Sequence, residues 1–259
     1  MPIALITDFG YRDAFVGIMK GVIAGINPNA QVIDLTHGVP AQDVMAGALV
    51  LRHAADHFPR GTIHVAVVDP GVGSARRALL VEADGDYFIG PDNGIFSLAV
   101  EGKTPSTIVK LSNPAYHLQP VGRTFHGRDI FAPVAAHLSL GVPPAAFGEP
   151  VDSFVRLALP KTLSCERHID GEVIYIDGYG NLFTNVSERD LTGLAGALAI
   201  ALGTVEVKGL APSYASAGAG EFVAVINSWG LLEISVYKGS AQRLSGAKIG
   251  DRVRVKCAG

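Results

Sequence analysis

The amino-acid sequence predicts an α/β protein, with a layered N-terminal α/β domain followed by a smaller antiparallel β domain. Over about the first 140 residues, short apolar runs typical of buried strands alternate with segments of helical periodicity, which indicates a layered and mostly parallel sheet. From Val142 onward prolines accumulate and the helical periodicity disappears. The remainder contains short β-type runs separated by Gly, Asn and Ser, the pattern of a small antiparallel sheet.

Apolar spacing and proline positions predict the N-terminal elements. A helix is expected over 13–26, with Asp13 as the better-placed N-cap, and a second helix over 41–58, between Pro40 and Pro59. The apolar runs predict strands over 3–7, 31–35, 62–68, 78–82 and 87–90, and we expect a short helix near Ile95 and a helix over 129–140 that ends at Gly141.

In the C-terminal part, strands are expected over 172–176, 204–208, 222–226, 231–235 and 252–255. We therefore expect an α/β domain over 1–150, a linker over 151–168 and a β domain over 169–259. A chain of 259 residues is long enough for two domains with separate cores.

The composition favours a small-molecule partner. A net charge of −3 and an isoelectric point near 6.2 give no electrostatic reason to expect nucleic acid or an anionic membrane as a partner.

The two cysteines, Cys165 and Cys257, are expected to be free thiols, and no signal-peptide pattern opens the sequence. The most apolar late segment, 194–205, is interrupted by Gly196 and Gly203 and is shorter than the about 20 residues of a membrane-spanning helix. We expect a cytoplasmic protein without a membrane anchor.

Several polar residues stand where an α/β sheet binds its ligands, beyond the carboxyl ends of strands. Asp8 follows the first strand and could accept two hydroxyl groups, such as those of a ribose, or could cap the next helix. Asp69 follows the strand at 62–68 and precedes Arg76. The glycines Gly71 and Gly73 lie between them without the Lys and Ser/Thr of a phosphate-binding loop, which favours a turn that brings Asp69 and Arg76 together.

Three other patterns admit both a structural and a functional interpretation. His126 precedes a predicted helix and is remote in sequence from Asp69, so it is either a structural histidine or a site residue. Asp177 and Asn181 bracket a Gly-rich turn, which they could stabilise or from which they could face a pocket. His53 and His57 have metal-binding spacing, but no Glu follows His53, so we favour a solvated helix end and expect no metal site.

Five motifs in order carry a family resemblance: TDFG at 7–10, DPGVG followed by RR at 69–77, PDNG at 91–94, TFHGRD at 124–129 and D-x-x-G-N at 177–181. The sequence resembles, over nearly its whole length, the S-adenosyl-L-methionine hydroxide adenosyltransferases. These adenosine-forming S-adenosylmethionine hydrolases are relatives of the fluorinases and chlorinases.

The resemblance implies that water or hydroxide attacks C5′ of S-adenosyl-L-methionine and releases adenosine and L-methionine, without a cofactor. It also implies a homotrimer in which the nucleoside substrate lies between the N-terminal domain of one subunit and the C-terminal domain of its neighbour. The family's Asp, Arg and His triad around a water corresponds to Asp69, Arg76 and His126.

The resemblance further assigns substrate contacts. They are Asp8 to the ribose hydroxyls, Asp13 and Asp177 to the methionine amino group, Asn181 to the adenine edge, Tyr214 and Phe183 to the nucleoside by packing, and Ser228 to the methionine carboxylate. Trp229 stands where relatives often have an Arg that assists with this carboxylate.

Two alternatives remain at this point. A halogenase is disfavoured, because halogenating relatives have Tyr in place of Asp69 and Ser in place of Gly127. A non-catalytic protein that binds S-adenosylmethionine or adenosine would keep Asp8, Asn181 and Tyr214 but would not need the triad.

Overall fold

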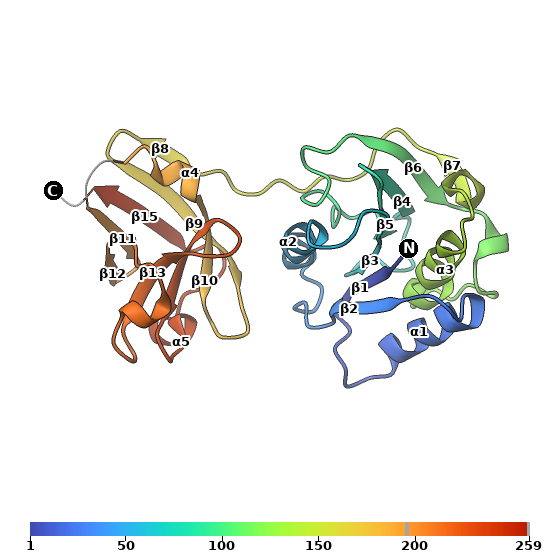
Figure 1. Cartoon of the computed structure of the whole chain (residues 1–259), viewed down its shortest axis with the longest axis horizontal. Helices are drawn as coiled ribbons and strands as arrows, with labels where there is room; N and C mark the ends of the chain where they lie inside the picture. The colour runs from blue at the N-terminus through green and yellow to red at the C-terminus, as the bar shows by residue number, and fades with distance from the viewer. Residues whose placement is uncertain (195–196, 258–259) are drawn as a thin grey trace. The chain divides into compact units, whose positions relative to one another are not determined.

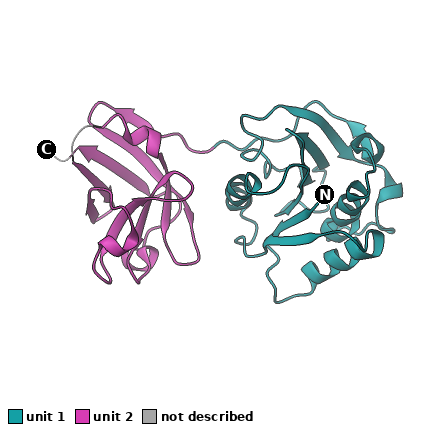
Figure 2. Cartoon of the chain, in the orientation of Figure 1, with its two compact units in different colours: residues 1–158 teal, residues 159–259 magenta. Residues whose placement is uncertain are grey.

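The computed structural model describes residues 1–194 and 197–257 and divides into two units, Met1–Ala158 and Leu159–Gly259 (Figure 2). Strand β8 (Leu163–Cys165) lies within the segment 151–168 that we expected to be a linker. Gly196, which interrupts the apolar segment discussed above, lies outside the described residues. Within the described ranges, no helix combines the length and hydrophobicity needed to cross a membrane.

A seven-stranded sheet with the order β2-β1-β3-β5-β4-β6-β7 forms the centre of the N-terminal unit. Its strands are β1 (Ile3–Thr7), β2 (Val32–Thr36), β3 (Ile63–Val67), β4 (Ala78–Ala83), β5 (Asp86–Pro91), β6 (Pro105–Leu111) and β7 (Gly148–Pro150).

The sheet is half parallel and half antiparallel, so the prediction of a mostly parallel sheet was wrong. Strands β2, β1, β3 and β5 pair in parallel, whereas β5, β4, β6 and β7 pair antiparallel. The change begins at a hairpin between β4 and β5, where Asp84 and Gly85 have φ of 51° and 87°. An Asp-Gly pair with positive φ is typical of a tight hairpin turn, so the signal was present in the sequence.

Helices cover both faces of this sheet. Figure 1 shows α1 (Phe15–Ile26) and α3 (Ala132–Ser139) on one side and α2 (Val44–Ala55) on the other. The buried side chains of α1 and α3 share one core cluster with alternate residues of β1 and β3, such as Leu5 and Val65. Parallel strands covered on both faces explain why β1 and β3 are buried at every position.

Two predictions about helix starts differ from the structure. Helix α1 begins at Phe15, and its N-cap is Ala14 with no side-chain hydrogen bond, so the prediction that Asp13 caps it was wrong. Helix α2 begins at Val44, after an N-cap Asp43 whose carboxylate accepts the backbone N–H of Ala46 at 2.9 Å.

The later helices also differ in part. Residues 95–100 form turns rather than the expected short helix, and there the Ser97 hydroxyl accepts the backbone N–H of Leu157 at 2.7 Å. The helix predicted from 129 opens with a π-helical turn, η2 (Gly127–Phe131), before α3. Gly141 follows the C-cap of α3 with a φ of 91°, which confirms its predicted role.

The C-terminal unit is an eight-stranded antiparallel sheet with the order β12-β11-β15-β9-β10-β14-β13, and β8 pairs with β9 off this path. The remaining elements are β9 (His168–Ile176), β10 (Leu182–Ser187), β11 (Leu198–Leu202), β12 (Val205–Lys208), β13 (Phe222–Ile226), β14 (Leu231–Val236), β15 (Arg252–Cys257), α4 (Glu188–Leu191) and α5 (Ala241–Ser245).

Candidate active site

The candidate site of the N-terminal unit lies at the carboxyl ends of β1 and β3, which are parallel neighbours. Asp8 directly follows β1, and Asp69 comes two residues after the end of β3. Both line a cavity of about 400 Å³, together with His126 from the start of the π-helical turn. The topology therefore brings together three residues that are widely separated in sequence.

Asp69, Arg76 and His126 form one hydrogen-bonded unit. The Arg76 Nε donates to both carboxylate oxygens of Asp69 at 3.0 Å, and its Nη2 makes a further, close ion pair with Oδ2. The same Nη2 donates to Nδ1 of His126 at 2.7 Å. The side chains of Arg76 and Asp69 are only 10% and 6% exposed, so this ion pair is shielded from solvent.

The contact with Arg76 determines the protonation state of His126. A guanidinium has donors and no acceptor, so Nδ1 must accept, and the neutral ring carries its proton on Nε2. Burial and the positive charge of Arg76 lower the pKa of His126, although Asp69 and Asp129 oppose the shift.

A glycine allows the two loops of the triad to meet. Gly73 has a φ of 77°, and a Cβ at this position would lie 2.3 Å from the backbone oxygen of Arg123. The loop that carries Arg76 thus packs against the backbone just before His126, and a larger residue at position 73 would force them apart. The turn at Gly71 and Gly73 brings Asp69 and Arg76 together, as expected.

A backbone hydrogen bond holds one oxygen of the Asp8 carboxylate and so orients the group. Its Oδ2 accepts the backbone N–H of Gln42 at 2.8 Å, and Gln42 has an unusual positive φ of 66°. An ionised carboxylate has about four acceptor positions, so Asp8 retains capacity for hydroxyl groups in the cavity. Asp13, in contrast, is exposed and is not among the residues that line this cavity.

Three phenylalanines form an aromatic wall of the same cavity. The ring centroids of Phe9, Phe15 and Phe125 are 5.2 to 5.8 Å apart, in tilted or edge-to-face contacts. Such a wall provides apolar surface next to the polar triad. Phe9 and Phe125 lie within the motifs TDFG and TFHGRD, which was the sequence signal for them.

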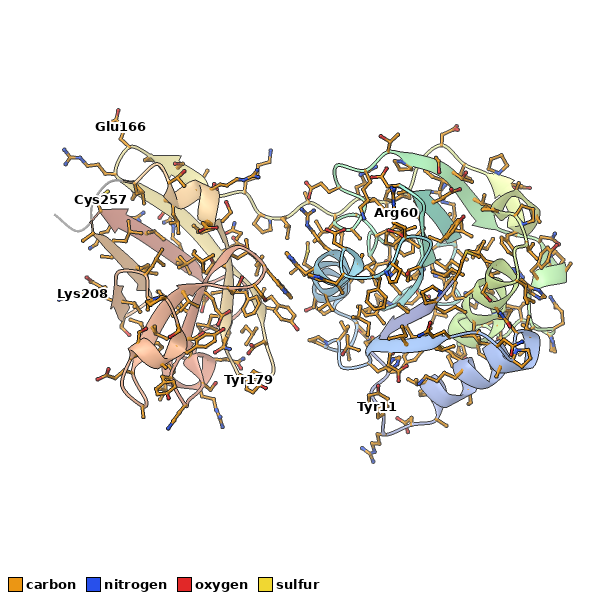
Figure 3. All side chains as sticks on the ribbon, viewed as in Figure 1. Tyr11, Arg60, Glu166, Tyr179, Lys208 and Cys257 are labelled. Carbon is orange, nitrogen blue, oxygen red and sulfur yellow. The ribbon has the colours of Figure 1, made fainter. Side chains whose placement is uncertain are left out.

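The C-terminal unit has its own cavity of about 540 Å³, lined by Asn181 and Tyr214 among the predicted residues. Tyr179, labelled in Figure 3, also lines it and is 81% exposed on the loop between β9 and β10. Two cations, Lys238 and Arg243, complete a polar and aromatic rim. The sequence offered no motif for these last two residues.

Asp177 supports the turn that presents Asn181. Its Oδ1 accepts the backbone N–H groups of Tyr179 and Asn181 at 2.9 Å, and its Oδ2 accepts Nδ2 of Asn181 at 2.9 Å. Both alternatives for these two residues hold in part, because they build the turn and Asn181 also faces the cavity.

Phe183 and Ser228 do not line either of these cavities. Phe183 is 8% exposed and packs edge-on against Trp229, with centroids 4.8 Å apart, and against Tyr175 at 5.5 Å. Ser228, next to Trp229, is exposed.

The remaining candidates are Arg77, His53 and His57, and their surroundings are those of structural or surface residues. Arg77 donates to Oδ2 of Asp92 at 2.7 Å and to the backbone oxygen of Ser153 at 2.9 Å, away from the triad. His53 is half-buried, and burial lowers its pKa to about 4, whereas His57 is exposed. In the part of the chain that the structure describes, no group of three or more His, Cys, Asp or Glu side chains is arranged to hold a metal ion.

Comparisons with known proteins agree with this layout. The family models of the N-terminal and C-terminal domains of the SAM hydroxide adenosyltransferases match residues 3–148 and 171–254. A curated relative from Thermus thermophilus, named (R)-S-adenosyl-L-methionine hydrolase, is 38% identical over 98% of this chain and 99% of its own length. A fluorinase from an Actinoplanes species is 28% identical over 90% of both chains.

A crystal structure of an uncharacterized conserved protein from Thermotoga maritima superposes with a TM-score of 0.92 at 34% identity, over 99% of this chain and 100% of that one. Both domain models, the full-length relatives and the fold thus lead to one assignment. The chain belongs to the SAM hydroxide adenosyltransferase family.

Proposed function

We propose that this protein is an enzyme that hydrolyses S-adenosyl-L-methionine to adenosine and L-methionine. The observation that carries the proposal is the continuous Asp69–Arg76–His126 unit beside the cavity at the carboxyl ends of β1 and β3. A protein that only bound the nucleoside would not need such a shielded, charge-assisted unit. Family membership and the full-length relatives named as hydrolases support the same reaction.

In the proposed reaction, an oxygen of water or hydroxide forms a bond to C5′ while the bond from C5′ to the sulfonium sulfur breaks. The electron pair of that bond stays on sulfur, which becomes the neutral thioether of methionine. The sulfonium group of the substrate carries a positive charge, whereas adenosine and the thioether of methionine do not. The reaction with water therefore releases one proton to the medium for each substrate hydrolysed.

The triad residues have different tasks in this reaction. Free water has a pKa of about 15.7, so a permanently cationic Arg76 is suited to stabilise a hydroxide-like nucleophile. Because Nδ1 of His126 already accepts from Arg76, we assign His126 to orienting the nucleophile and the guanidinium. Asp69 holds Arg76 through both of its oxygens.

For substrate binding we propose the contacts that the family pattern implies. Asp8 accepts the ribose hydroxyls, and Asn181 contacts the adenine edge from a turn that Asp177 holds. The other proposed contacts are Tyr214 and Phe183 with the nucleoside, Asp13 and Asp177 with the methionine amino group, and Ser228 with the carboxylate.

We propose that the active form is a homotrimer and that each substrate is held by the first domain of one subunit and the second domain of its neighbour. This is supported by the division of the candidate residues between two cavities, one in each unit. We further propose that the enzyme works in the cytoplasm without a cofactor and without nucleic acid, as its free cysteines and its net charge of −3 suggest.

Incubation of the purified protein with S-adenosylmethionine in ¹⁸O-labelled water tests the reaction. We expect adenosine that carries the label on its 5′ oxygen, together with methionine and acidification of the medium. Binding without turnover would instead support the non-catalytic alternative. A 5′-halogenated adenosine formed with chloride or fluoride present would support the halogenase alternative, which Asp69 and Gly127 disfavour.

A further inference from the structure

The loop that carries Asp8 is held by the loop that follows the neighbouring strand β2. Strands β1 and β2 pair in parallel, so the two loops leave the same edge of the sheet. The backbone N–H of Gly10 donates to the backbone oxygen of His37 at 2.8 Å, and that of Gln42 donates to Oδ2 of Asp8 at 2.8 Å. Contacts from the second loop thus reach both the backbone of the first loop and the carboxylate of Asp8.

A side-chain contact joins the same two loops. His37 is 1% exposed, and its Nδ1 shares a hydrogen bond with the hydroxyl of the fully buried Thr7 at 2.8 Å. The Thr7 hydroxyl also accepts the backbone N–H of Phe9 at 3.2 Å. This hydroxyl therefore fixes the backbone on both sides of Asp8, because its own residue precedes Asp8 and its second partner follows it.

Asp34 holds the other side of the His37 ring. Its Oδ1 lies 3.1 Å from Nε2 of His37, and both atoms are buried. An ionised carboxylate can only accept, so Nε2 carries a proton and the contact is attractive. The Oδ2 of Asp34 accepts from Nζ of Lys20 in α1 at 2.6 Å and from the hydroxyl of Tyr11, labelled in Figure 3, at 3.2 Å. A chain of contacts thus runs from α1 through Asp34 and His37 to Thr7.

This network reaches the cavity through Asp8. Asp8 lines the cavity, whereas Thr7, His37 and Asp34 are not among the described residues that line it. Two hydroxyl groups on adjacent ribose carbons require a carboxylate at a defined position and angle, and a displacement of about 1 Å is enough to weaken such contacts. The ties on both sides of Asp8 supply this placement.

We propose that His37 is a positioning residue that orients Asp8, through the Thr7 hydroxyl, toward the two ribose hydroxyls of a nucleoside. This deepens the proposed function and rests on it, since it takes the ribose contact of Asp8 as given. The preference for a ribose over a sugar without these hydroxyls then depends on His37 and Thr7 as well as on Asp8.

The full-length protein tests the proposal through its affinities for adenosine and for 2′,3′-dideoxyadenosine, measured by calorimetry, and through kcat and KM for S-adenosylmethionine. The unmodified protein should prefer adenosine by on the order of 100-fold, because hydrogen bonds between hydroxyls and a carboxylate are strong. His37→Leu and Thr7→Val should each lower this preference about tenfold and raise KM about tenfold, with kcat within about threefold. The double variant should lie within about threefold of either single one, because both changes break the same contact.

Three further variants separate positioning from stability. His37→Asn places its amide near the position of Nδ1, so it retains a partner for Thr7 and should keep the preference within about threefold of the unmodified protein. His37→Gln places its amide near Nε2 and should show the loss. The matched control is His64→Leu, the same substitution at a fully buried histidine of β3, which should change stability but neither the preference nor KM.

If His37→Leu does not fold, Thr7→Val and the pair His37→Asn and His37→Gln decide the outcome. An unchanged preference in Thr7→Val or in His37→Gln would overturn the positioning role, as would an equal loss of affinity for both nucleosides. An unmodified protein that binds both nucleosides equally would overturn the ribose contact on which this role rests. One that binds neither nucleoside and does not hydrolyse S-adenosylmethionine would overturn the proposed function itself.

Discussion

Arg76 donates a hydrogen bond to Nδ1 of His126 at 2.7 Å, although the two residues are 50 positions apart in sequence. The same guanidinium holds both oxygens of Asp69, so it links an acid and an imidazole that do not bond each other directly. A protonated His126 would have to direct an N–H at a permanent cation. The arrangement therefore depends on a neutral imidazole, and its dependence on pH follows from this contact.

The first prediction concerns the pH dependence of hydrolysis. The pKa of His126 is lowered from 6.5, so the ring is neutral at pH 7 and gains its proton only at lower pH. We expect kcat/KM to be flat between about pH 7 and 8 and to fall on an acid limb whose midpoint lies below 6.5. His126→Gln retains an acceptor for Arg76 but has no titration, so this limb should vanish at a reduced overall rate. An acid limb unchanged in His126→Gln would assign it to another group.

Replacement of Arg76 by lysine tests the linking role. An ammonium cannot hold both oxygens of Asp69 and reach His126 in one geometry, so Arg76→Lys should lower kcat by about 100-fold or more. The matched control is Arg77→Lys, the same substitution at the adjacent residue, whose partners are Asp92 and Ser153. Chromatographic assay of adenosine release should place the control within about threefold of the unmodified enzyme, and equal losses in both would contradict the assignment.

Gly73→Ala should separate the two loops of the triad. The new Cβ would clash with the backbone oxygen of Arg123 in addition to straining a φ of 77°. Gly85→Ala is the control, because Gly85 has a φ of 87° but open space around its Cβ position. Both variants should lose about 1 kcal/mol or more of unfolding free energy, but only Gly73→Ala should also lose most of its turnover. Comparable turnover in the two variants would mean that the contact with Arg123 does not position the triad.

His64 predicts an acid-dependent stability. Its ring is fully buried, neither ring nitrogen has a hydrogen-bond partner among the residues that the structure describes, and burial lowers its pKa to about 4. The unfolded chain binds a proton near pH 6.5 and the folded one only near 4, so stability falls as the pH drops between these values, by up to about 3 kcal/mol. His64→Leu should remove this loss and should raise stability more at pH 5 than at pH 8.

Urea unfolding at the two pH values, with hydrogen exchange of the β3 amides as the reporter of this unit, measures the effect. The exposed His57 provides the control, since His57→Leu should change the unfolding free energy by less than about 0.5 kcal/mol at either pH. A His64→Leu variant with the same acid sensitivity as the unmodified protein would show that another group is responsible.

Strand ends were the part of the site that could be predicted from sequence. Runs rich in apolar residues identify β1 and β3, and their parallel pairing then brings Asp8 and Asp69 together. The family motifs supplied His126, because spacing along the chain contains no information on its contact with Arg76.

The surroundings of residues that depend on tertiary packing could not be predicted from the sequence. Glu233 in β14 follows the usual alternation of apolar and polar residues in a strand, which indicates exposure to solvent, yet it is 1% exposed and accepts a hydrogen bond from the Ser235 hydroxyl at 2.5 Å. Gln42 contributes through its backbone N–H and its positive φ, neither of which is specified by its side chain. Asp13 lies at an expected cap position, but the helix starts two residues later.

The last prediction tests the proposed sharing of substrate between subunits. His126→Ala damages only the first domain and Asn181→Ala only the second, so each protein alone should be inactive or bind poorly. In a closed cyclic trimer with heterologous interfaces, mixed refolding in equal amounts should leave about a quarter of the sites with two unmutated domains. Mass spectrometry of differently tagged chains must first show that mixed trimers form. Recovery toward a quarter of the unmodified activity supports the shared site, whereas verified mixed trimers without recovery would mean that each site is built within a single chain.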